Sequence, residues 1–141
     1  MTENEFKLVH SDLIQQVQCI ENDLRIIYAA MKTGEFEDNF DDLERANLGT
    51  IIKKLKELDY SDGPPDLAEE HYDVIDNIRE IRNYWCHQCY LDFVYIKDDE
   101  EREKRFNAIA ERLVSDEYRT FDLHKKLERL RNFKLREFHR I

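Results

Sequence analysis

The chain has 141 residues, of which 41% are hydrophobic and 38% are charged, and its 22 basic and 32 acidic side chains give a net charge of −10. This length suits one domain with one core, and three glycines with two prolines leave too few turn formers for a β-sandwich or a barrel. The negative charge opposes long-range attraction to nucleic acids and to anionic membranes.

The N-terminal stretch predicts one long helix, because apolar residues recur at alternating spacings of four and three. These residues are Leu13, Val17, Ile20, Leu24, Ile27 and Met31. Gly34 follows where a C-terminal cap belongs. A second helix is expected from Asp41 or Asp42 to about Leu58, with an inward face made of Leu43, Leu48, Ile51, Ile52, Leu55 and Leu58.

The strongest break in the sequence is the segment 62–66, whose prolines and acids also suit the start of a helix. A third helix is predicted from about Asp66 to Tyr95, with a core stripe of Val74, Ile78, Ile81 and Trp85. The acidic cluster 98–101 opens a fourth helix, which carries Phe106, Ile109 and Leu113. Ser115 and Asp116 offer the cap of a fifth helix that reaches the C-terminus. We therefore predict a single all-α domain over residues 1–141, an up-and-down bundle of about five helices.

Targeting signals are not expected. No run approaches the roughly 18 apolar residues that a membrane span needs, and residues 1–7 lack the start of a secretory signal. Three cysteines, an odd count, favour reduced thiols over a disulfide framework. These observations predict a soluble, cytoplasmic protein that does not bind membranes.

Basic residues gather toward the C-terminus. Residues 119–141 carry eight basic side chains against three acidic ones, a segment charge of +5, so the remaining 118 residues carry −15. We interpret this segment as a solvated helix that balances an acidic body, and guidance of a polyanion is the alternative.

The end of the predicted third helix concentrates polar side chains. Asn83 and His87 share a face at a spacing of four, with Arg79 and Tyr90 nearby. Arg82 lies between this polar face and the apolar stripe, and its long side chain can reach either.

The triplet of Arg82, Asn83 and His87 resembles the shared motif of the HEPN superfamily, in which an arginine, usually followed by a polar residue, precedes a histidine by four to six intervening residues. Members are small helical bundles that pair so that two motifs face one cleft. Catalytic members are metal-independent endoribonucleases, often toxins of toxin–antitoxin or phage-defence systems. The resemblance therefore implies a homodimer, an RNA substrate, no cofactor and an antitoxin or regulatory protein as a partner. Some toxins of the superfamily carry a tyrosine two residues after the histidine, where this chain has Cys89 and the tyrosine follows at Tyr90.

The residue types fit RNA cleavage, because RNA carries its own nucleophile, the 2′-hydroxyl. His87 can act as an acid or base near neutral pH, and Arg82 can stabilise charge on the phosphate. Asn83 can hold the phosphate or orient the histidine. Arg79 and Tyr90 are the predicted substrate-binding residues, and we predict that cleavage yields a 2′,3′-cyclic phosphate.

A second pair, Arg119 and His124, has the same offset. We favour Arg82 because an asparagine follows it, and composition alone would produce this triplet only about 0.02 times. Cys86 and Cys89 lack the second cysteine pair of a four-ligand zinc site, so we predict packed thiols and no metal site. His71 is interpreted as a hydrogen-bonded core residue.

The rival interpretation is a non-catalytic helical-bundle interaction module that assembles, or binds a nucleotide or protein partner, through the face of Arg82 and His87. A partly open, positive cleft would favour catalysis, whereas pairing of both side chains with carboxylates would favour a structural role. We interpret the aromatic cluster as core packing, and a homodimer face or a surface for another protein remain its alternatives. The cluster comprises Tyr84, Trp85, Tyr90, Phe93 and Tyr95.

Overall fold

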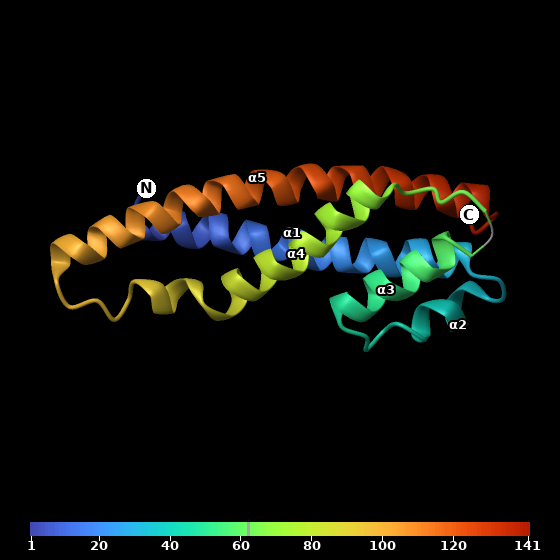
Figure 1. Ribbon diagram of the computed structural model, residues 1–141, viewed down its shortest axis with the longest axis horizontal. Coiled ribbons are helices and arrows are strands. Elements are labelled where there is room, and N and C mark those ends of the chain that lie inside the picture. The colour runs from blue at the N-terminus through green and yellow to red at the C-terminus, as the bar shows by residue number, and fades with distance from the viewer. Residues whose placement is uncertain (62) are drawn as a thin grey trace.

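The computed structural model describes residues 1–61 and 63–141, and in these ranges all regular structure is helical (Figure 1). It comprises α1 (Glu3–Met31), α2 (Phe36–Asp41), α3 (Leu48–Asp59), α4 (Glu69–His87), the 3-10 helix η1 (Cys89–Asp92) and α5 (Asp99–Glu137). The predicted all-α bundle is confirmed for this part of the chain. Asp62, the first residue of the predicted break, lies outside the described residues. No helix in the described ranges combines the length and the apolar character that crossing a membrane requires.

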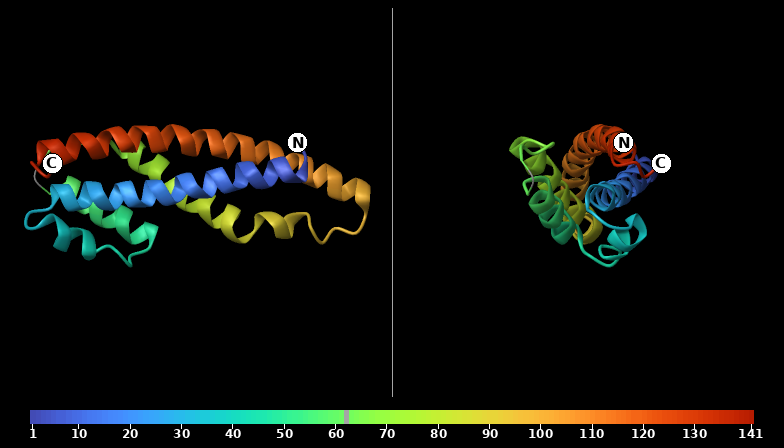
Figure 2. Two further views of the ribbon diagram at one scale, coloured as in Figure 1. Left: turned by 180° about the vertical axis from the view of Figure 1, so that it is seen from behind. Right: turned by 90° about the vertical axis from the view of Figure 1, so that its right-hand side faces the viewer.

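The two long helices α1 and α5 lie side by side along an elongated molecule and run in the same direction (Figures 1 and 2). Two side-chain hydrogen bonds agree with this parallel arrangement, because the later residue of α1 pairs with the later residue of α5: Gln16 with Glu117, and Asp23 with Arg131. α4 returns obliquely in the opposite direction, so that successive α-helices alternate as in an up-and-down bundle (Figure 1). α3 packs against α1 and α4.

α1 matches its prediction closely. Thr2 Oγ1 accepts from the backbone N–H of Glu5 (3.1 Å), and Glu5 Oε2 accepts from the N–H of Thr2 (3.3 Å), which satisfies two free donors at the helix start. The predicted stripe is buried from Leu13 to Ile27. The helix ends before Gly34, whose φ of +102° lies in the left-handed region that favours glycine.

The predicted second helix is divided, because residues 42–47 form a turn between α2 and α3. Arg25 of α1 donates to the backbone carbonyls of Leu43 (3.0 Å) and Ala46 (3.2 Å) and so holds this turn. Asn47 then caps α3 through its side-chain oxygen. The apolar periodicity of the sequence continues across this segment and predicted one helix. The helix is interrupted because the Arg25 side chain, from α1, binds backbone carbonyl groups of the turn.

α4 is shorter at both ends than the helix predicted for residues 66–95. At its start, the Asp59 carboxylate accepts the backbone N–H groups of Asp66 (2.8 Å) and Leu67 (3.1 Å), which holds these residues in a turn. The predicted core residue Val74 is 51% exposed. The other predicted stripe residues, Ile78, Ile81 and Trp85, are buried as expected, and Tyr72 and Ile75 complete the buried face.

The predicted fourth and fifth helices are one continuous helix, α5, and the predicted cap at Ser115 and Asp116 is wrong. Asp116 is buried inside the helix, where its carboxylate accepts the indole N–H of Trp85 (2.9 Å). Thr120 bonds back to the carbonyl of Asp116 (2.7 Å). Asp116, a residue type that often caps a helix, therefore makes a tertiary contact here. Residues 99–137 also contain neither glycine nor proline, which would favour the end of a helix.

Candidate functional site

Trp85 fixes the C-terminal half of α4 against both long helices. Its indole N–H donates to Asp116 of α5, and its backbone oxygen accepts from Nε2 of His10 on α1 (2.7 Å). The ring is 1% exposed. Because Arg82 and His87 lie within one turn of this anchor on the same helix, Trp85 sets the directions in which both side chains leave α4.

Arg82 and His87 line one open hollow between α4 and α1, with a volume of about 290 Å³. We call it the Arg82 hollow. Cys86 contributes to its α4 side, and its α1 side is formed by Ile14, Val17, Gln18 and Glu21. The two residues that the motif linked therefore share one surface that a ligand can reach.

A carboxylate of α1 holds the Arg82 guanidinium. Its Nη1–H donates to Oε1 of Glu21 at 2.7 Å, and its Nη2–H donates to Oδ1 of Asn83 at 3.4 Å. The Arg82 side chain is 27% exposed and that of Glu21 is 17% exposed, so water partly screens the pair. These contacts use two of the five guanidinium N–H donors. The others can bind an anion, although Glu21 offsets the positive charge of the hollow.

Asn83 and His87 are exposed on the outer side of α4. His87 is the last residue of the helix, at the rim of the Arg82 hollow. An imidazole in this position can exchange a proton with a bound ligand without any rearrangement of the core.

The two thiols near this site have different environments. Cys86 lines the Arg82 hollow, and burial raises the pKa of its thiol, while the charge of Arg82 lowers it. Cys89 is buried and donates to the backbone oxygen of Trp85 (3.4 Å), and burial raises its pKa to about 11. Both thiols thus favour the protonated form. Cys89 is packed as predicted, whereas the prediction of a packed thiol is wrong for Cys86, which is exposed. Among the described residues, no group of three or more His, Cys, Asp or Glu side chains is placed to hold a metal ion.

The structure does not bring the predicted substrate-binding residues into the Arg82 hollow. Arg79 points toward Asp76, with Nη2 and Oδ1 3.6 Å apart, and its guanidinium approaches Gly49 of α3. Tyr90 packs on the ring of Phe6 at 5.7 Å between centroids, in an aromatic cluster at the other side of the helix end. Burial raises the pKa of the Tyr90 hydroxyl.

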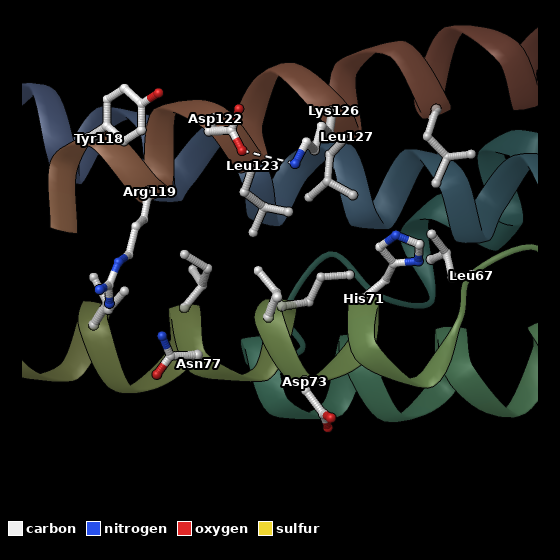
Figure 3. Close-up of a pocket in the computed structure, with 15 residues that line it drawn as sticks. Leu67, His71, Asp73, Asn77, Tyr118, Arg119, Asp122, Leu123, Lys126 and Leu127 are labelled. Atoms are coloured by element: carbon white, nitrogen blue, oxygen red, sulfur yellow. Dashed lines mark ion pairs between the residues drawn. The ribbon is translucent and has the colours of Figure 1, made fainter. Parts of the chain in front are cut away.

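The alternative pair of Arg119 and His124 is separated across α5. His124 faces α1, where its Nε2 lies 3.8 Å from Oδ2 of Asp23. Arg119 reaches toward α4 in a groove of about 700 Å³ between α4 and α5 (Figure 3). A spacing of five residues turns a helix by about 140°, so the two side chains belong to different surfaces.

The same groove corrects the prediction for His71, which is exposed at the groove and is not a core residue. Its Nδ1 accepts the backbone N–H of Ala68 (3.1 Å) at the start of α4, so it acts as a helix cap. The groove has an apolar floor that includes Ile78 and Leu123, and Asp122 pairs with Lys126 on its rim at 3.0 Å (Figure 3).

Glu21 is the residue of this site that the sequence did not predict. It lies 61 positions before Arg82, and no motif links the two. Its position beside the stripe residue Ile20 places it at the edge of the buried face of α1, which is the only local signal.

Comparison of the chain with family models, with curated proteins and with solved structures finds no match. The resemblance to the HEPN superfamily therefore stays a prediction that rests on Arg82, Asn83 and His87.

Proposed function

We propose that the protein is a metal-independent endoribonuclease in which Arg82 and His87 act on one phosphate of an RNA strand. The observation that carries this proposal is their common position on the Arg82 hollow, with His87 exposed and donors of Arg82 available. The all-α architecture and the Arg-Asn-x3-His triplet agree with the resemblance to the HEPN superfamily.

The reaction needs few groups from the protein. The 2′-hydroxyl attacks the adjacent phosphorus, the bond to the 5′-oxygen breaks, and the products are a 2′,3′-cyclic phosphate and a 5′-hydroxyl. His87 takes or gives a proton, and Arg82 binds the phosphate as its charge grows. Asn83, which accepts from Arg82, helps to hold the guanidinium. A second proton-transfer group is supplied by a second copy of the chain, so the proposal includes a two-fold homodimer.

Glu21 acts in this proposal as a positioning residue. Its ion pair with Arg82 fixes the direction of the guanidinium, which lowers the entropy lost on binding a phosphate. It also weakens the attraction of the Arg82 hollow for RNA, since the carboxylate and the phosphate compete for the same donors. The basic segment 119–141 then attracts the polyanion, in a chain with a net charge of −10.

The second candidate function is a non-catalytic module that binds a nucleotide or protein partner, or assembles, through the same face. The Arg82–Glu21 pair favours it, because an arginine already neutralised by a carboxylate gives little of the positive potential that RNA cleavage requires. An antitoxin or other regulatory protein is the partner that the resemblance implies.

Cleavage of a mixed RNA pool in excess chelator separates the two candidates. We compare the wild type with His87→Ala and with His139→Ala, a control at an exposed histidine outside the Arg82 hollow. The endoribonuclease predicts products that end in 2′,3′-cyclic phosphate with the wild type and with His139→Ala, and none with folded His87→Ala. Absence of cleavage by a folded wild-type dimer would favour the binding module.

A further inference from the structure

A second polar hollow lies between α1 and α5, on the other side of α1 from the Arg82 hollow. We call it the Asp23 hollow. Its volume is about 240 Å³. Its lining consists of three amides of α1, one thiol of α1 and three groups that are charged or can be charged: Gln15, Gln18, Asn22, Cys19, Asp23, His124 and Arg131.

The centre of this hollow is an incompletely bonded carboxylate. Asp23 is 1% exposed, and its Oδ1 accepts from Nη1–H of Arg131 at 2.7 Å. Its Oδ2 is buried and has no hydrogen-bond partner within the described residues. Nε2 of His124 is 3.8 Å away, too far for a hydrogen bond. A buried carboxylate oxygen without a donor costs free energy that an incoming N–H group would recover.

A second buried oxygen of α1 also lacks a hydrogen-bond donor. Oε1 of Gln16 is also buried without a partner, although its Nε2 donates to Glu117 at 2.9 Å. Gln16 and Asp23 are seven residues apart and face α5 from one side of α1. Two buried oxygens on this side of α1 therefore lack donors within the described residues, and the one at the hollow, Oδ2 of Asp23, favours a ligand that brings an N–H group.

The Asp23 hollow adjoins the Arg82 hollow. Gln18 lines both, because it lies on the outer ridge of α1 between them. That ridge carries neutral amides, so no exposed carboxylate of residues 13–20 separates the two hollows. Because both hollows share Gln18, we place them on the path of one RNA strand.

We propose that the Asp23 hollow binds one unpaired RNA base that carries an exocyclic amino group, in the same strand as the phosphate bound at Arg82. This inference rests on the proposed function. The amino group of cytosine, adenine or guanine donates to Oδ2 of Asp23. Uracil has no amino group, and its N3–H donor lies between two carbonyl oxygens, which the carboxylate repels. Unpaired bases stack on histidine and arginine planes, and His124 and Arg131 supply both at this hollow.

The size and lining agree with a single base. A volume of 240 Å³ is smaller than the roughly 300 to 1,000 Å³ of sites for drug-sized ligands. The His124 side chain is 24% exposed, and its Nε2 lies 3.8 Å from Oδ2 of Asp23. The base therefore takes the place of the imidazole beside this oxygen and stacks on the displaced imidazole ring. The amides of Gln15, Gln18 and Asn22 can donate to and accept from the remaining edge of the base.

Binding without cleavage tests this inference separately from the proposed function. His87→Ala is titrated with short single-stranded oligocytidylate, oligoadenylate and oligouridylate, because this variant lacks the proposed proton-transfer group and binding is then measured without cleavage. We expect the cytidylate and the adenylate to bind at least about fivefold more tightly than the uridylate. Asp23→Asn should remove this difference, whereas Asp122→Asn, at an exposed carboxylate on the groove side of α5, should preserve it.

Because Asp23→Asn loses a buried ion pair and can unfold, a second measurement uses the intact side chain. Titration of cytidine 5′-monophosphate should shift the imidazole NMR signals of His124, and uridine 5′-monophosphate should shift them far less. His139 serves as the internal control. Equal affinity for all three oligonucleotides, no binding, or equal shifts at His124 would overturn the inference. A preference for amino-bearing bases without cleavage by the wild type would support the base pocket and contradict the endoribonuclease.

Discussion

Two carboxylates of α1, two residues apart, each hold an arginine from a later helix beside a histidine. The two sets are Glu21, Arg82 and His87 on one side of α1, and Asp23, Arg131 and His124 on the other. Both ion pairs have an N–O distance of 2.7 Å, and both arginine side chains are 27% exposed. The carboxylates differ, because the Glu21 side chain is 17% exposed and that of Asp23 is 2% exposed.

The position of each carboxylate around α1 explains this difference. Two residues turn an α-helix by about 200°, so Glu21 borders the open side of α4 while Asp23 faces α5 across the seam of the two long helices. An ion pair that water reaches contributes little stability and can exchange partners with a ligand. When a buried carboxylate such as that of Asp23 loses its arginine, an uncompensated charge stays in the interior. A carboxylate, an arginine and a histidine can thus form an exchangeable site on one side of α1 and part of the helix interface on the other.

The largest expected effect is on the rate of RNA cleavage, at the set of Glu21, Arg82 and His87. Arg82→Lys keeps the charge but loses the planar fork that binds a phosphate through two N–H groups. We expect the cleavage rate to fall by about 100-fold or more, the range observed when one donor to a developing negative charge is removed. Arg119→Lys is the matched control, because Arg119 has the same offset to a histidine but lies in the groove between α4 and α5. Wild-type turnover by Arg82→Lys would exclude bidentate phosphate binding.

The next effect is on stability, and it compares the two carboxylates directly. Arg131→Ala leaves the buried Asp23 carboxylate without its partner, so the free energy of unfolding should fall by about 2 to 3 kcal/mol. Arg82→Ala leaves the Glu21 carboxylate, which water partly screens, and the loss should stay below about 1 kcal/mol. Urea denaturation of both variants and the wild type measures the difference. Equal losses would mean that the exposure of the carboxylate does not decide the contribution of these pairs.

A smaller effect is expected on RNA affinity at the exposed set. Glu21→Gln removes the negative charge that competes for Arg82 and keeps a side chain of the same size. The affinity of a catalytically inactive His87→Ala background for single-stranded RNA should rise severalfold at low salt, and the gain should shrink as salt increases. The background without the Glu21 change is the reference. Weaker binding would show that Glu21 serves mainly to orient the guanidinium.

The apolar pattern predicted much of this fold. The stripe from Leu13 to Ile27 and the core residues Phe106, Ile109 and Leu113 are buried as expected. The predicted helix boundaries were wrong where a side chain distant in sequence binds a backbone group or the side chain of a predicted cap residue. Local periodicity contains no information on such contacts. Arg25 on the 42–47 turn is one example.

The candidate site was predictable to the extent that one helix contains it. Arg82 and His87 are close in sequence, so the helical spacing alone placed them on one surface. Glu21 and Asp23 come from α1 and meet their arginines 61 and 108 residues later, through the parallel packing of α5 and the oblique course of α4. Pairing of that kind depends on the tertiary arrangement of the helices.

The smallest expected effect is the pH dependence of stability that the buried carboxylate of Asp23 produces. Burial raises the pKa of Asp23 above its ordinary value of 3.8, although Arg131 and His124 lower it, and Glu128 adds to the rise. Because the folded protein then binds this proton more tightly than the unfolded chain, the contribution is fully present below pH 3.8 and is lost as the pH rises through the raised pKa. The free energy of unfolding of the wild type, minus that of Asp23→Asn, should therefore decrease as the pH rises from below 3.8 toward neutral. Repeating the urea series at high salt should preserve the trend, since burial is not screened by ions. A difference that grows with pH would mean that the ion pair with Arg131 outweighs burial, and Asp23 would then stabilise the folded state as a charged group.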